Sequence, residues 1–572
     1  MTLKQHILDV FTKAFTQAFP KLDVTSHPIE ITPSTNERFG HYQCNSAMKL
    51  TKLLQIPPRE ISSKVLVLVE QDRIFHKVEI AGPGFINITL SADYLSKRCQ
   101  AMDPQKKPEL ANDRVVIDFS SPNVAKEMHV GHLRSTIIGD SIARLLEYLG
   151  DDVLRLNHIG DWGTAFGMLI AYIKRFEPKI ITHQKEVDLT TLVQFYKDAK
   201  KRFDEDAEFK KDSQLEVVKL QQGEEQATLA WQVICEISRK AYQEIYDLLD
   251  IQLTERGESY YNPQLADVVS ELEKKGLIEI SDGAKCLFLE GFVNREGEPL
   301  PFMLQKSDGG FNYASTDMAA IRHRIQDEKA SRLIYVTDSG QATHFAMLFA
   351  AAKKAGYLDP SKVRADHVPF GLVLGPDGKK FKTRSGDTER LIDLLTAAIE
   401  KAEQILKERD DNYTSEEIKE IAHTLGINAV KYSDLVCNRT GDYTFSYDRM
   451  LRFEGNTAAF LMYSYVRIQG IKRKIQGDST LGEIQLDHPS EVNLGLHLAQ
   501  FDEVLLSIAD DLLMNRLCEY LFQLAEKFNA FFRDCRVEGV PEQAQRLAIC
   551  ELTASVLKKG MDILGLKTVT RM

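Results

Sequence analysis

The segment Pro122-Asn-Val-Ala-Lys-Glu-Met-His-Val-Gly-His132 decides the fold predicted for this chain of 572 residues. The residues before it, Arg114 to Phe119, form a short β-branched run that predicts a strand. After it, apolar residues recur at helical spacing from Ser135 to Gly150, and the glycine is placed to end the helix. Val153 to Leu156 predicts the next strand. Strand, loop, helix and strand in this order form a βαβ unit, which implies a parallel sheet.

A second unit of this kind begins with the strand-like run Arg332 to Val336. A helical pattern follows from Gln341 to Ala355, and Gly356 is again placed to end it. Between the two units, a charged and helix-rich stretch at about residues 177–257 indicates an insertion. We therefore predict an α/β, Rossmann-type, doubly wound domain over residues 109–390, with a helical insertion at about 177–257.

Two further domains are expected on either side of it. Residues 1–108 begin with a helical pattern, contain strand-like segments at Lys77 to Ile80 and Gly84 to Leu90, and end in a proline-containing linker, which predicts an α+β domain. Residues 391–572 have helical periodicity nearly throughout, which predicts an all-α domain. Three domains suit the length, because single cores stop growing beyond about 250–300 residues.

The composition favours a cytoplasmic protein. Hydrophobic residues make up 43% of the chain and charged residues 27%, and no apolar run approaches the ~20 residues of a membrane span. The first residues do not resemble a targeting peptide. Eight scattered cysteines without a Cys-x-x-Cys pair argue against zinc and against a disulfide framework. The net charge of −11 is mild evidence against a nucleic-acid partner, although a local basic face would be enough to bind one.

The loop that opens the first helix carries the chemistry. In a doubly wound sheet this loop lies at the ligand-binding edge, beside a helix N-terminus. Gly131 lets the backbone approach a nucleotide base, and His129 and His132 can donate to phosphate oxygens during displacement at phosphorus. The pattern His-x-Gly-His also occurs by chance. The segment Asn157-His-Ile-Gly-Asp161 matches its first three positions but lacks the second histidine.

A basic loop downstream supports the functional interpretation. The segment Gly378-Lys-Lys-Phe-Lys-Thr-Arg-Ser-Gly386 follows an apolar strand expected from His367 to Leu374. Such a loop could bind a triphosphate and neutralise departing pyrophosphate, with Lys380 and Lys382 as its cations. A solvated hairpin tip is the alternative, but the pairing with the histidine loop favours nucleotide binding.

The histidine loop resembles the signature of class I aminoacyl-tRNA synthetases and related nucleotidylyl transferases. The blocks Asp118 to Gly139 and Gly160 to Gly167, with Tyr313 to Asp317 and the end of the chain, resemble the arginyl-tRNA synthetases over essentially the whole length. The basic loop resembles their lysine signature in degenerate form, with Thr383 where a second lysine usually stands, a departure common in that family. The resemblance implies an ATP-dependent ligase that forms arginyl-adenylate and transfers arginine to tRNA(Arg), with Mg²⁺ accompanying ATP. From the cysteine pattern and the lack of a long apolar run we expect no zinc and no membrane contact. We expect a monomer.

The resemblance also implies the roles of individual residues. Tyr313 and Asp317 would hold the substrate guanidinium, for which a carboxylate offers the strongest fork of hydrogen bonds. The α-ammonium and α-carboxylate groups of arginine would be held by Asp118, Asn123, His129 and Gln341. ATP would contact Gly131, His132, Lys380 and Lys382. The catalytic set would be His129, His132, Lys380 and Lys126, the last replacing the charge missing at Thr383. Alternatively, Tyr313 belongs to the core, Asp317 caps a helix beginning near Thr316, and Gln341 simply opens its helix.

The flanking domains are implied to bind tRNA. Stacking rings and amide edges suit unpaired bases. The candidates are Phe39 and Gln43 at the outer corner of the tRNA, with Tyr42 and Asn45 beside them, and Phe460, Tyr463, Arg467 and Met572 at the anticodon. Aromatic stripes are more often part of a core. A small-molecule ligase or nucleotidylyl transferase is the alternative function, although it would not need a helical RNA-binding domain. A non-catalytic paralogue should have lost His129, His132 or Lys380.

Overall fold

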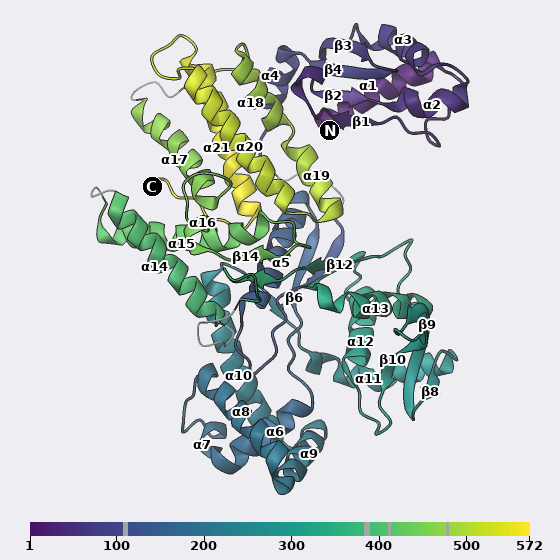
Figure 1. Ribbon diagram of the computed structural model, residues 1–572, viewed down its shortest axis with the longest axis vertical. Helices are drawn as coiled ribbons and strands as arrows, with labels where there is room; N and C mark the ends of the chain where they lie inside the picture. The colour runs from purple at the N-terminus through teal and green to yellow at the C-terminus, as the bar shows by residue number, and fades with distance from the viewer. Residues whose placement is uncertain (107–111, 382–388, 410–412, 476–479) are drawn as a thin grey trace.

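The computed structural model describes residues 1–106, 112–381, 389–409, 413–475 and 480–572. A parallel sheet lies at the centre (Figure 1). The N-terminal unit and the C-terminal helices lie toward one end of the molecule, and a group of helices inserted in the sheet domain lies at the other.

The central sheet confirms the doubly wound α/β prediction. Its five strands are parallel and lie in the order β12-β11-β5-β6-β7. The strand order reverses between β5 and β11, so loops following these two strands diverge and leave a crevice for a ligand. The strands are β5 (Arg114–Asp118), β6 (Asp152–Asn157), β7 (Thr254–Glu255), β11 (Arg332–Asp338) and β12 (Arg364–Phe370), and their helices include α5 (Val130–Leu149) and α13 (Ala342–Lys354).

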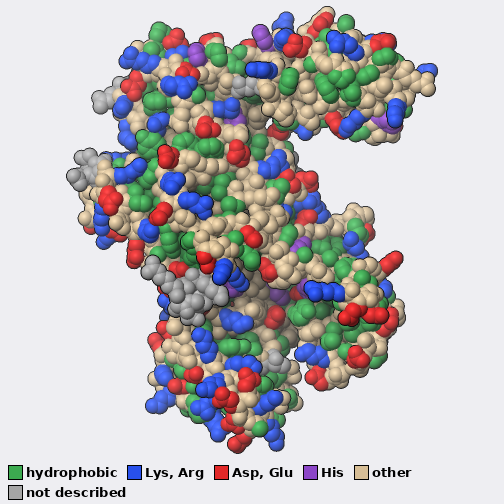
Figure 2. All heavy atoms as spheres, viewed as in Figure 1, with side chains coloured by type: hydrophobic (Ala, Val, Ile, Leu, Met, Phe, Trp, Pro, Cys, Tyr) green, Lys and Arg blue, Asp and Glu red, His purple; other side chains and the backbone are tan. Residues whose placement is uncertain are grey.

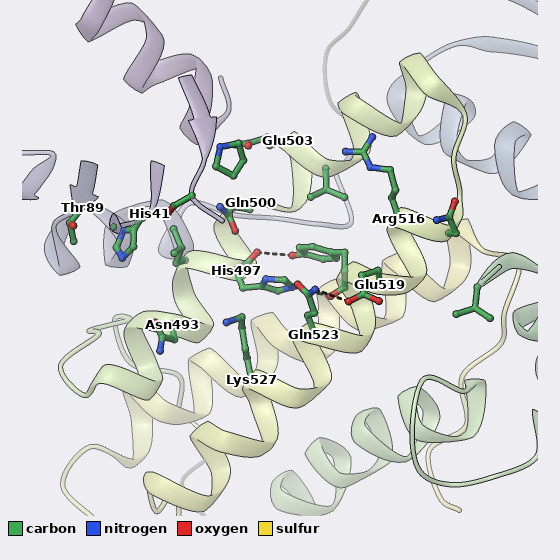
Figure 3. A pocket seen from close by; sticks show the side chains of 18 residues that line it. His41, Thr89, Asn493, His497, Gln500, Glu503, Arg516, Glu519, Gln523 and Lys527 are labelled. Atoms are coloured by element: carbon green, nitrogen blue, oxygen red, sulfur yellow. Dashed lines mark hydrogen bonds between the residues drawn. The ribbon is translucent and has the colours of Figure 1, made fainter. Parts of the chain in front are cut away.

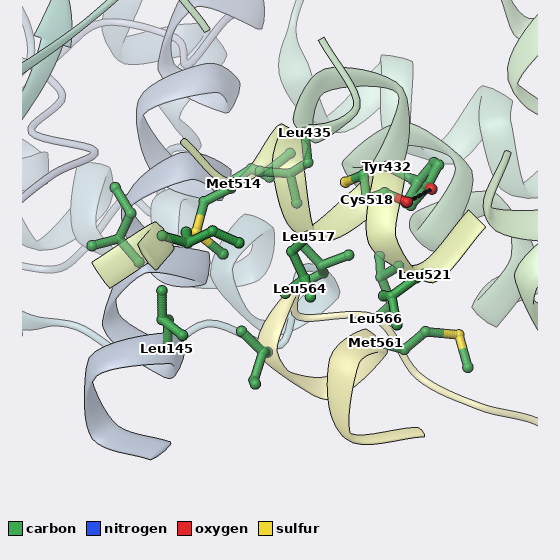
Figure 4. Close-up of a cluster of buried hydrophobic side chains, with 14 of the residues drawn as sticks. Leu145, Tyr432, Leu435, Met514, Leu517, Cys518, Leu521, Met561, Leu564 and Leu566 are labelled. Atoms are coloured by element: carbon green, nitrogen blue, oxygen red, sulfur yellow. Dashed lines mark hydrogen bonds between the residues drawn. The ribbon is translucent and has the colours of Figure 1, made fainter. Parts of the chain in front are cut away.

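Helix α5 begins at Val130, five residues before the predicted start, because His129 caps its N-terminus. It is buried on almost all sides, since it lies between the sheet and the C-terminal helices. Figure 4 shows Leu145 of this helix beside a cluster of apolar side chains from the C-terminal part of the chain, including Leu435, Leu517 and Leu564. The end of the helix at Gly150, with φ of 108°, is as predicted.

Two units interrupt the sheet domain. The first consists of α6 (Thr164–Phe176), α7 (Pro178–Ile181), α8 (Leu189–Glu205), α9 (Ala207–Gln221) and α10 (Glu225–Leu248). Its helical layer begins before residue 177, because α6 packs on α8 and α9. The second unit was not expected: it joins η2 (Glu258–Tyr261), α11 (Asn262–Lys274) and α12 (Tyr313–Gln326) to an antiparallel sheet of β8 (Glu279–Ser281), β9 (Ala284–Val293) and β10 (Pro299–Gln305).

The N-terminal unit has a four-stranded antiparallel sheet in the order β1-β2-β4-β3, covered by helices. Buried residues of α1 and α3, such as Phe11 and Val65, belong to the same core as Ile86 and Ile88 of the sheet. The elements are α1 (Leu3–Ala18), β1 (Ile31–Pro33), η1 (Glu37–Phe39), β2 (Tyr42–Cys44), α2 (Ser46–Leu54), α3 (Pro58–Val69), β3 (Phe75–Ala81), β4 (Phe85–Leu90) and α4 (Ala92–Gln100).

Among the residues that the structure describes from 389 onward, β14 (Tyr443–Thr444) is the only strand, and it pairs with β13 (Val373–Leu374); the other elements there are helices. The strand predicted from His367 to Leu374 is interrupted after Phe370. The N–H of Gly371 donates to the carbonyl of Arg439, and the N–H of Leu372 donates to the side chain of Asp442. The remaining elements are η3 (Ser339–Gln341), α14 (Leu391–Arg409), α15 (Ser415–Leu435), α16 (Tyr447–Met450), α17 (Ala458–Lys474), α18 (Pro489–Ala499), α19 (Phe501–Asp511), α20 (Asn515–Asp534) and α21 (Gln543–Ile563).

Candidate active site

The two histidines of the β5–α5 loop are fixed by the backbone of the same loop. Nδ1 of His129 accepts a hydrogen bond from the N–H of Gly131 at 3.0 Å, and Nδ1 of His132 accepts one from the N–H of His129 at 3.1 Å. The ring centroids are 4.1 Å apart. Because Nδ1 is the acceptor in both rings, each neutral imidazole carries its proton on Nε2. The two rings can therefore donate from Nε2 beside the N-terminus of α5.

Both histidines are uncharged at neutral pH. Burial lowers the pKa of His132 to about 3, with smaller effects from His129 and Lys126. Burial also lowers the pKa of His129, followed by the charge of Lys380. These effects show that Lys126 lies near one ring and Lys380 near the other. Four of the predicted residues thus lie together at a helix N-terminus, which favours anions.

The described ends of the basic loop are attached to this site. Lys380 forms a β-bridge with Leu374, and Arg390, after the loop, forms an antiparallel bridge with His129. The N–H of Leu391 also donates to the carbonyl of Met128 at 2.8 Å. The predicted ATP contact Lys382 and its neighbour Thr383 lie outside the described residues.

The predicted guanidinium site is on α12. This helix begins at Tyr313 and not near Thr316, because the side chain of Asn312 caps it through the N–H of Ala314 at 3.1 Å. Tyr313 is 64% exposed and is therefore not part of the core. Asp317 lies one turn further along the helix and is bonded to a histidine, His344, whose Nε2 is 2.6 Å from Oδ2. The alternative in which Asp317 caps the helix is wrong.

Three residues near Asp317 were not predicted from the sequence. His344 is on α13, and its ring centroid is 5.0 Å from that of Tyr313. Nε2 of His158 is 3.9 Å from Oδ1 of Asp317. Burial raises the pKa of Glu258 to about 7, and the negative charges of Asp317 and Asp161 act in the same direction. The site therefore concentrates acids that would favour a cation.

His158 belongs to the segment that matches three letters of the histidine motif. Its imidazole is buried, and its Nδ1 has no hydrogen-bond partner among the described residues. In the sequence, the segment from Gly160 to Gly167, which resembles the family, begins two residues after His158 and was the only pattern that could have indicated it. No local pattern indicated His344 or Glu258, because they come from elements far from Asp317 in the chain.

Asp118, predicted to help hold the amino-acid end of arginine, is paired with an arginine of the protein itself. It is buried, and its Oδ2 is 2.8 Å from Nη2 of Arg324, which is itself fully buried. Its Oδ1 accepts a hydrogen bond from the hydroxyl of Ser121 at 2.9 Å. The charge of this carboxylate is therefore already compensated by a resident guanidinium.

The remaining predicted contacts for arginine are exposed. Asn123 forms a β-bridge with Gly160, and its carbonyl accepts from the hydroxyl of Tyr242 at 2.6 Å. A side chain at Gly160 would clash with Asn123, since a Cβ there would be 2.0 Å from Oδ1. Gln341 donates to Asp338 at 2.9 Å and lies at the end of η3, immediately before α13.

The surface of the sheet domain is hollowed between its two inserted units. Figure 2 shows histidine side chains where the surface is hollowed between the helices of the first inserted unit and the unit that contains β8–β10. Among the described residues there is no group of three or more histidine, cysteine, aspartate or glutamate side chains able to hold a metal ion. All eight cysteines are free. Within the same residues, no helix combines the length and apolar character needed to cross a membrane.

The tRNA-contact candidates divide into exposed and packed residues. Phe39 is 45% exposed, whereas Gln43 donates to Asn87 at 2.8 Å and Tyr42 is wholly buried, with its hydroxyl donating to Glu503. Asn45 precedes α2 without capping it. The ring of Tyr42 therefore belongs to the core and is not available to stack on a base.

The C-terminal candidates divide in the same way. Tyr463 is 40% exposed, and the guanidinium carbon of Arg467 lies 5.1 Å from its ring and 5.6 Å from that of Phe532, which was not predicted. Phe460 packs on Phe522 with ring centroids 5.4 Å apart, and Met572 packs against the core.

A cavity of about 670 Å³ lies where the N-terminal unit meets α18, α19 and α20. In Figure 3, His41 lies on the left of it, Arg516 lies on the right, and Lys527 lies below His497. Burial lowers the pKa of His497, which also lines the cavity, to about 4. Phe39 precedes the lining residues Gly40 and His41 in the chain.

Known families and proteins match the whole chain. The catalytic domain of class I (R) tRNA synthetases matches residues 96–447, the DALR anticodon binding domain matches 461–572, and the arginyl tRNA synthetase N-terminal domain matches 1–90. An arginine–tRNA ligase of Protochlamydia amoebophila is 60% identical over 100% of both chains, and one of Nostoc punctiforme is 51% identical over 100% of this chain and 99% of its own.

Solved structures agree with these matches. Arginyl-tRNA synthetase from Plasmodium falciparum superimposes with a TM-score of 0.87 and 34% identity, covering 100% of this chain and 99% of its own. The Thermus thermophilus enzyme, at 21% identity, shares the fold with a TM-score of 0.81 over 100% of both chains.

Proposed function

The chain belongs to the arginyl-tRNA synthetases of class I, and from this membership we propose that it activates L-arginine with ATP and transfers it to tRNA(Arg). The observation that carries the proposal is the grouping of His129, His132, Lys126 and Lys380 at the N-terminus of α5, together with Asp317 on α12. A small-molecule ligase is not favoured, because the anticodon-binding and N-terminal family models match this chain as well.

In the first step, a carboxylate oxygen of arginine attacks the α-phosphorus of ATP. The new oxygen–phosphorus bond forms as the bond to the departing pyrophosphate breaks, which gives arginyl-adenylate. Negative charge accumulates on the phosphate oxygens, and the Nε2 protons of His129 and His132 can donate to it without a charged imidazole. Gly131 leaves room for ATP, and Lys126, Lys380 and Lys382 supply positive charge. This catalysis consists of positioning and electrostatics.

The guanidinium of arginine is bound by Asp317, with Tyr313 beside it and Glu258 as a second carboxylate. Support comes from the orientation of Asp317: His344 occupies Oδ2, so Oδ1 remains for the substrate. Asn123, Gln341 and His129 bind the other end of arginine. Asp118 acts there together with Arg324, and not as an isolated charge.

In the second step, a hydroxyl of the terminal ribose of tRNA attacks the carbonyl carbon of the adenylate, and AMP leaves. Residues 391–572 form the anticodon-binding domain, residues 1–108 the domain at the outer corner of the tRNA, and residues 109–390 the catalytic domain with its insertion at about 177–257. The exposed rings of Phe39 and Tyr463, with Arg467, are suited to stacking on unpaired bases. Gln43, Phe460 and Met572 contact the tRNA beside these stacked bases.

Three further properties belong to the proposal. Mg²⁺ would accompany ATP and would neutralise part of the charge on its phosphate groups. The protein acts as a monomer, which light scattering would test. It works in the cytoplasm, consistent with its eight free cysteines.

The decisive experiment is ATP–pyrophosphate exchange with each amino acid, with and without tRNA. Exchange that depends on arginine, followed by charging of tRNA(Arg), is expected. Exchange with another amino acid, or nucleotidyl transfer to a small molecule without charging, would refute the proposal.

A further inference from the structure

A fully buried arginine lies on α5 two residues beyond the histidine motif. Arg134 and its partner Asp434 on α15 have no exposed side-chain surface, and Nε of the arginine is 3.1 Å from a carboxylate oxygen. Nη1 also donates to the carbonyl of Gly441 at 3.1 Å. The guanidinium carbon lies 5.7 Å from the centre of the Phe370 ring and 5.2 Å from that of Tyr443.

The groups around this guanidinium belong to the base of the basic loop. Gly441 and Tyr443 lie in the segment that follows α15, and this segment holds the chain after β12 by backbone hydrogen bonds. The N–H of Tyr443 donates to Leu372 at 3.1 Å, and the N–H of Phe445 donates to Leu374 at 2.9 Å. The basic loop follows Leu374 closely in the chain. The pairing of β13 with β14 therefore fixes where the loop begins.

Arg134 therefore joins three parts of the molecule at one point. Its backbone belongs to the helix whose N-terminus carries His129 and His132, its ion pair reaches the helical domain, and its second nitrogen reaches the base of the lysine loop. Figure 1 shows α5, α15 and β14 close together at the centre of the molecule, and α5 contacts α15 directly.

Stability alone does not explain such a pair. Two buried charges lose hydration, and well-packed apolar residues of similar volume are often as stable or more so. An apolar pair, however, could not donate to Gly441 or hold the Tyr443 ring by its charge. What the ion pair adds is a defined position for the segment that bears the lysines.

We propose that Arg134 is a positioning residue for adenylate formation: it fixes the base of the lysine loop against the histidine pair. This inference rests on the proposed function. Because the transition state needs the lysines and histidines on opposite sides of the same phosphates, a small displacement of the loop base should lower turnover strongly. A misplacement of about 1 Å can cost a factor of about 10².

The test compares Arg134→Met with Arg332→Met as a matched control. Arg332 pairs with Asp366 of β12 at 2.8 Å and also links the sheet to the helical domain, by donating to the carbonyl of Ala509 at 2.8 Å. It lies at the N-terminal end of β11, opposite to the end of β12 from which the loop segment continues. In arginine-dependent ATP–pyrophosphate exchange with tRNA present, Arg134→Met should lower kcat by about 10²-fold and leave the KM for arginine unchanged. Arg332→Met should keep the wild-type kcat after a comparable fall in melting temperature.

A second pair of variants separates positioning from stability. The double variant Arg134→Met with Asp434→Leu should regain melting temperature, because no unpaired charge remains, but should not regain kcat. Arg134→Lys keeps the charge opposite Asp434 without the fork that reaches Gly441, so it should also have reduced kcat. If Arg134→Met does not fold, these two variants decide the question. A wild-type kcat in either would overturn the proposal, whereas absence of arginine-dependent exchange in the wild-type protein would overturn the proposed function instead.

Discussion

Nε2 of His344 lies 2.6 Å from Oδ2 of Asp317, although the two residues are on different helices. The hydrogen bond fixes the plane of the carboxylate and occupies one of its oxygens. The other, Oδ1, points to the side of His158, 3.9 Å from its Nε2. A planar cation entering between Tyr313 and His158 would therefore meet an oriented acceptor.

Asp317→Asn should weaken arginine binding much more than ATP binding. The change keeps the shape but removes the negative charge, and breaking one side of a buried ion pair typically costs ~3–5 kcal/mol. The KM for arginine should rise by more than about 10²-fold, and the KM for ATP should change little, both measured in pyrophosphate exchange. Asp327→Asn is the control, because Asp327 is an exposed acid at the end of the same helix. Equal losses for both substrates would remove Asp317 from the guanidinium site.

Glu258 should make arginine affinity depend on pH. Burial, then Asp317 and Asp161, raises the pKa of Glu258 to about 7, above its ordinary value of 4.5. Without substrate, the folded protein therefore binds this proton better than the unfolded chain, so the group stabilises the fold below pH 4.5, and this contribution is lost as the pH rises toward 7. Bound guanidinium should favour the ionised form. The dissociation constant for arginine, measured by calorimetry, should fall as the pH rises through 7.

The matched variant for this prediction is Glu258→Gln, in which nothing titrates at that position. Its arginine affinity should be weaker at pH 8 and should lose the dependence between pH 6 and 8. Glu279→Gln, a change at an exposed strand residue, should keep the wild-type profile. A wild-type profile in Glu258→Gln would assign the titration to another group.

Local patterns in the sequence were enough to predict the sheet, α5 and the histidine loop. Helix α5 was predicted from the spacing of apolar residues after Ser135 and from the glycine at Gly150, which are close together in the sequence. Tyr313 and Asp317 are likewise only one helical turn apart. The start of α5 was placed too late, because a histidine is not among the usual N-cap residues. The C-terminal domain was correctly predicted to be mainly helical for the same local reasons.

Pairs that come together only on folding were not predictable. The bonds from His344 to Asp317 and from Arg324 to Asp118 join residues far apart in the chain, and periodicity contains no information on such contacts. Tyr42 looked like a base-reading residue beside Phe39, but its ring is in the core, because strand alternation turns it inward. The sheet of β8–β10 was missed among the alternating segments of the second inserted unit.

Arg467→Ala should weaken tRNA binding without changing arginine activation by more than about twofold. The guanidinium lies between the rings of Tyr463 and Phe532 and is held there by Asn529 at 2.7 Å. Stacking on an exposed base contributes about 1–3 kcal/mol, so the KM for tRNA in the charging reaction should rise by about 5- to 150-fold. Arg473→Ala is the control, because Arg473 instead donates to the carbonyl of Thr570.

Point variants test the helical domain better than a truncation. Removing the chain from Glu454 onward should abolish charging, but it would also expose the face of α5 that packs on α19 and α21. A loss of charging would then reflect damage to the catalytic domain as readily as loss of tRNA contact. An unchanged KM for tRNA in Arg467→Ala would contradict the anticodon role of this residue directly.

Lys126→Ala tests the charge that replaces the usual second lysine of the loop. Lys126 is exposed, three residues before His129, and its charge is among the causes that lower the pKa of His132. Its carbonyl accepts from the hydroxyl of Tyr242 at 2.7 Å, which fixes the backbone while the side chain stays free to reach a ligand. Among the described residues it forms no ion pair, and Glu127 is instead bonded to Thr190 at 3.0 Å.

Because Thr383 stands where a lysine is usual, the phosphates need a cation from the opposite side of the site. Lys126→Ala should therefore lower the kcat of pyrophosphate exchange by about 10²–10³, the scale for loss of one transition-state donor, while the KM for arginine stays the same. Restoring a lysine by Thr383→Lys in the same chain should recover part of the loss, since the charge would return from the loop. Lys240→Ala, at an exposed lysine of α10, should have no effect. If Lys126→Ala keeps full kcat, the missing charge comes from the loop itself, and Lys382 and Arg384 are the residues to change next.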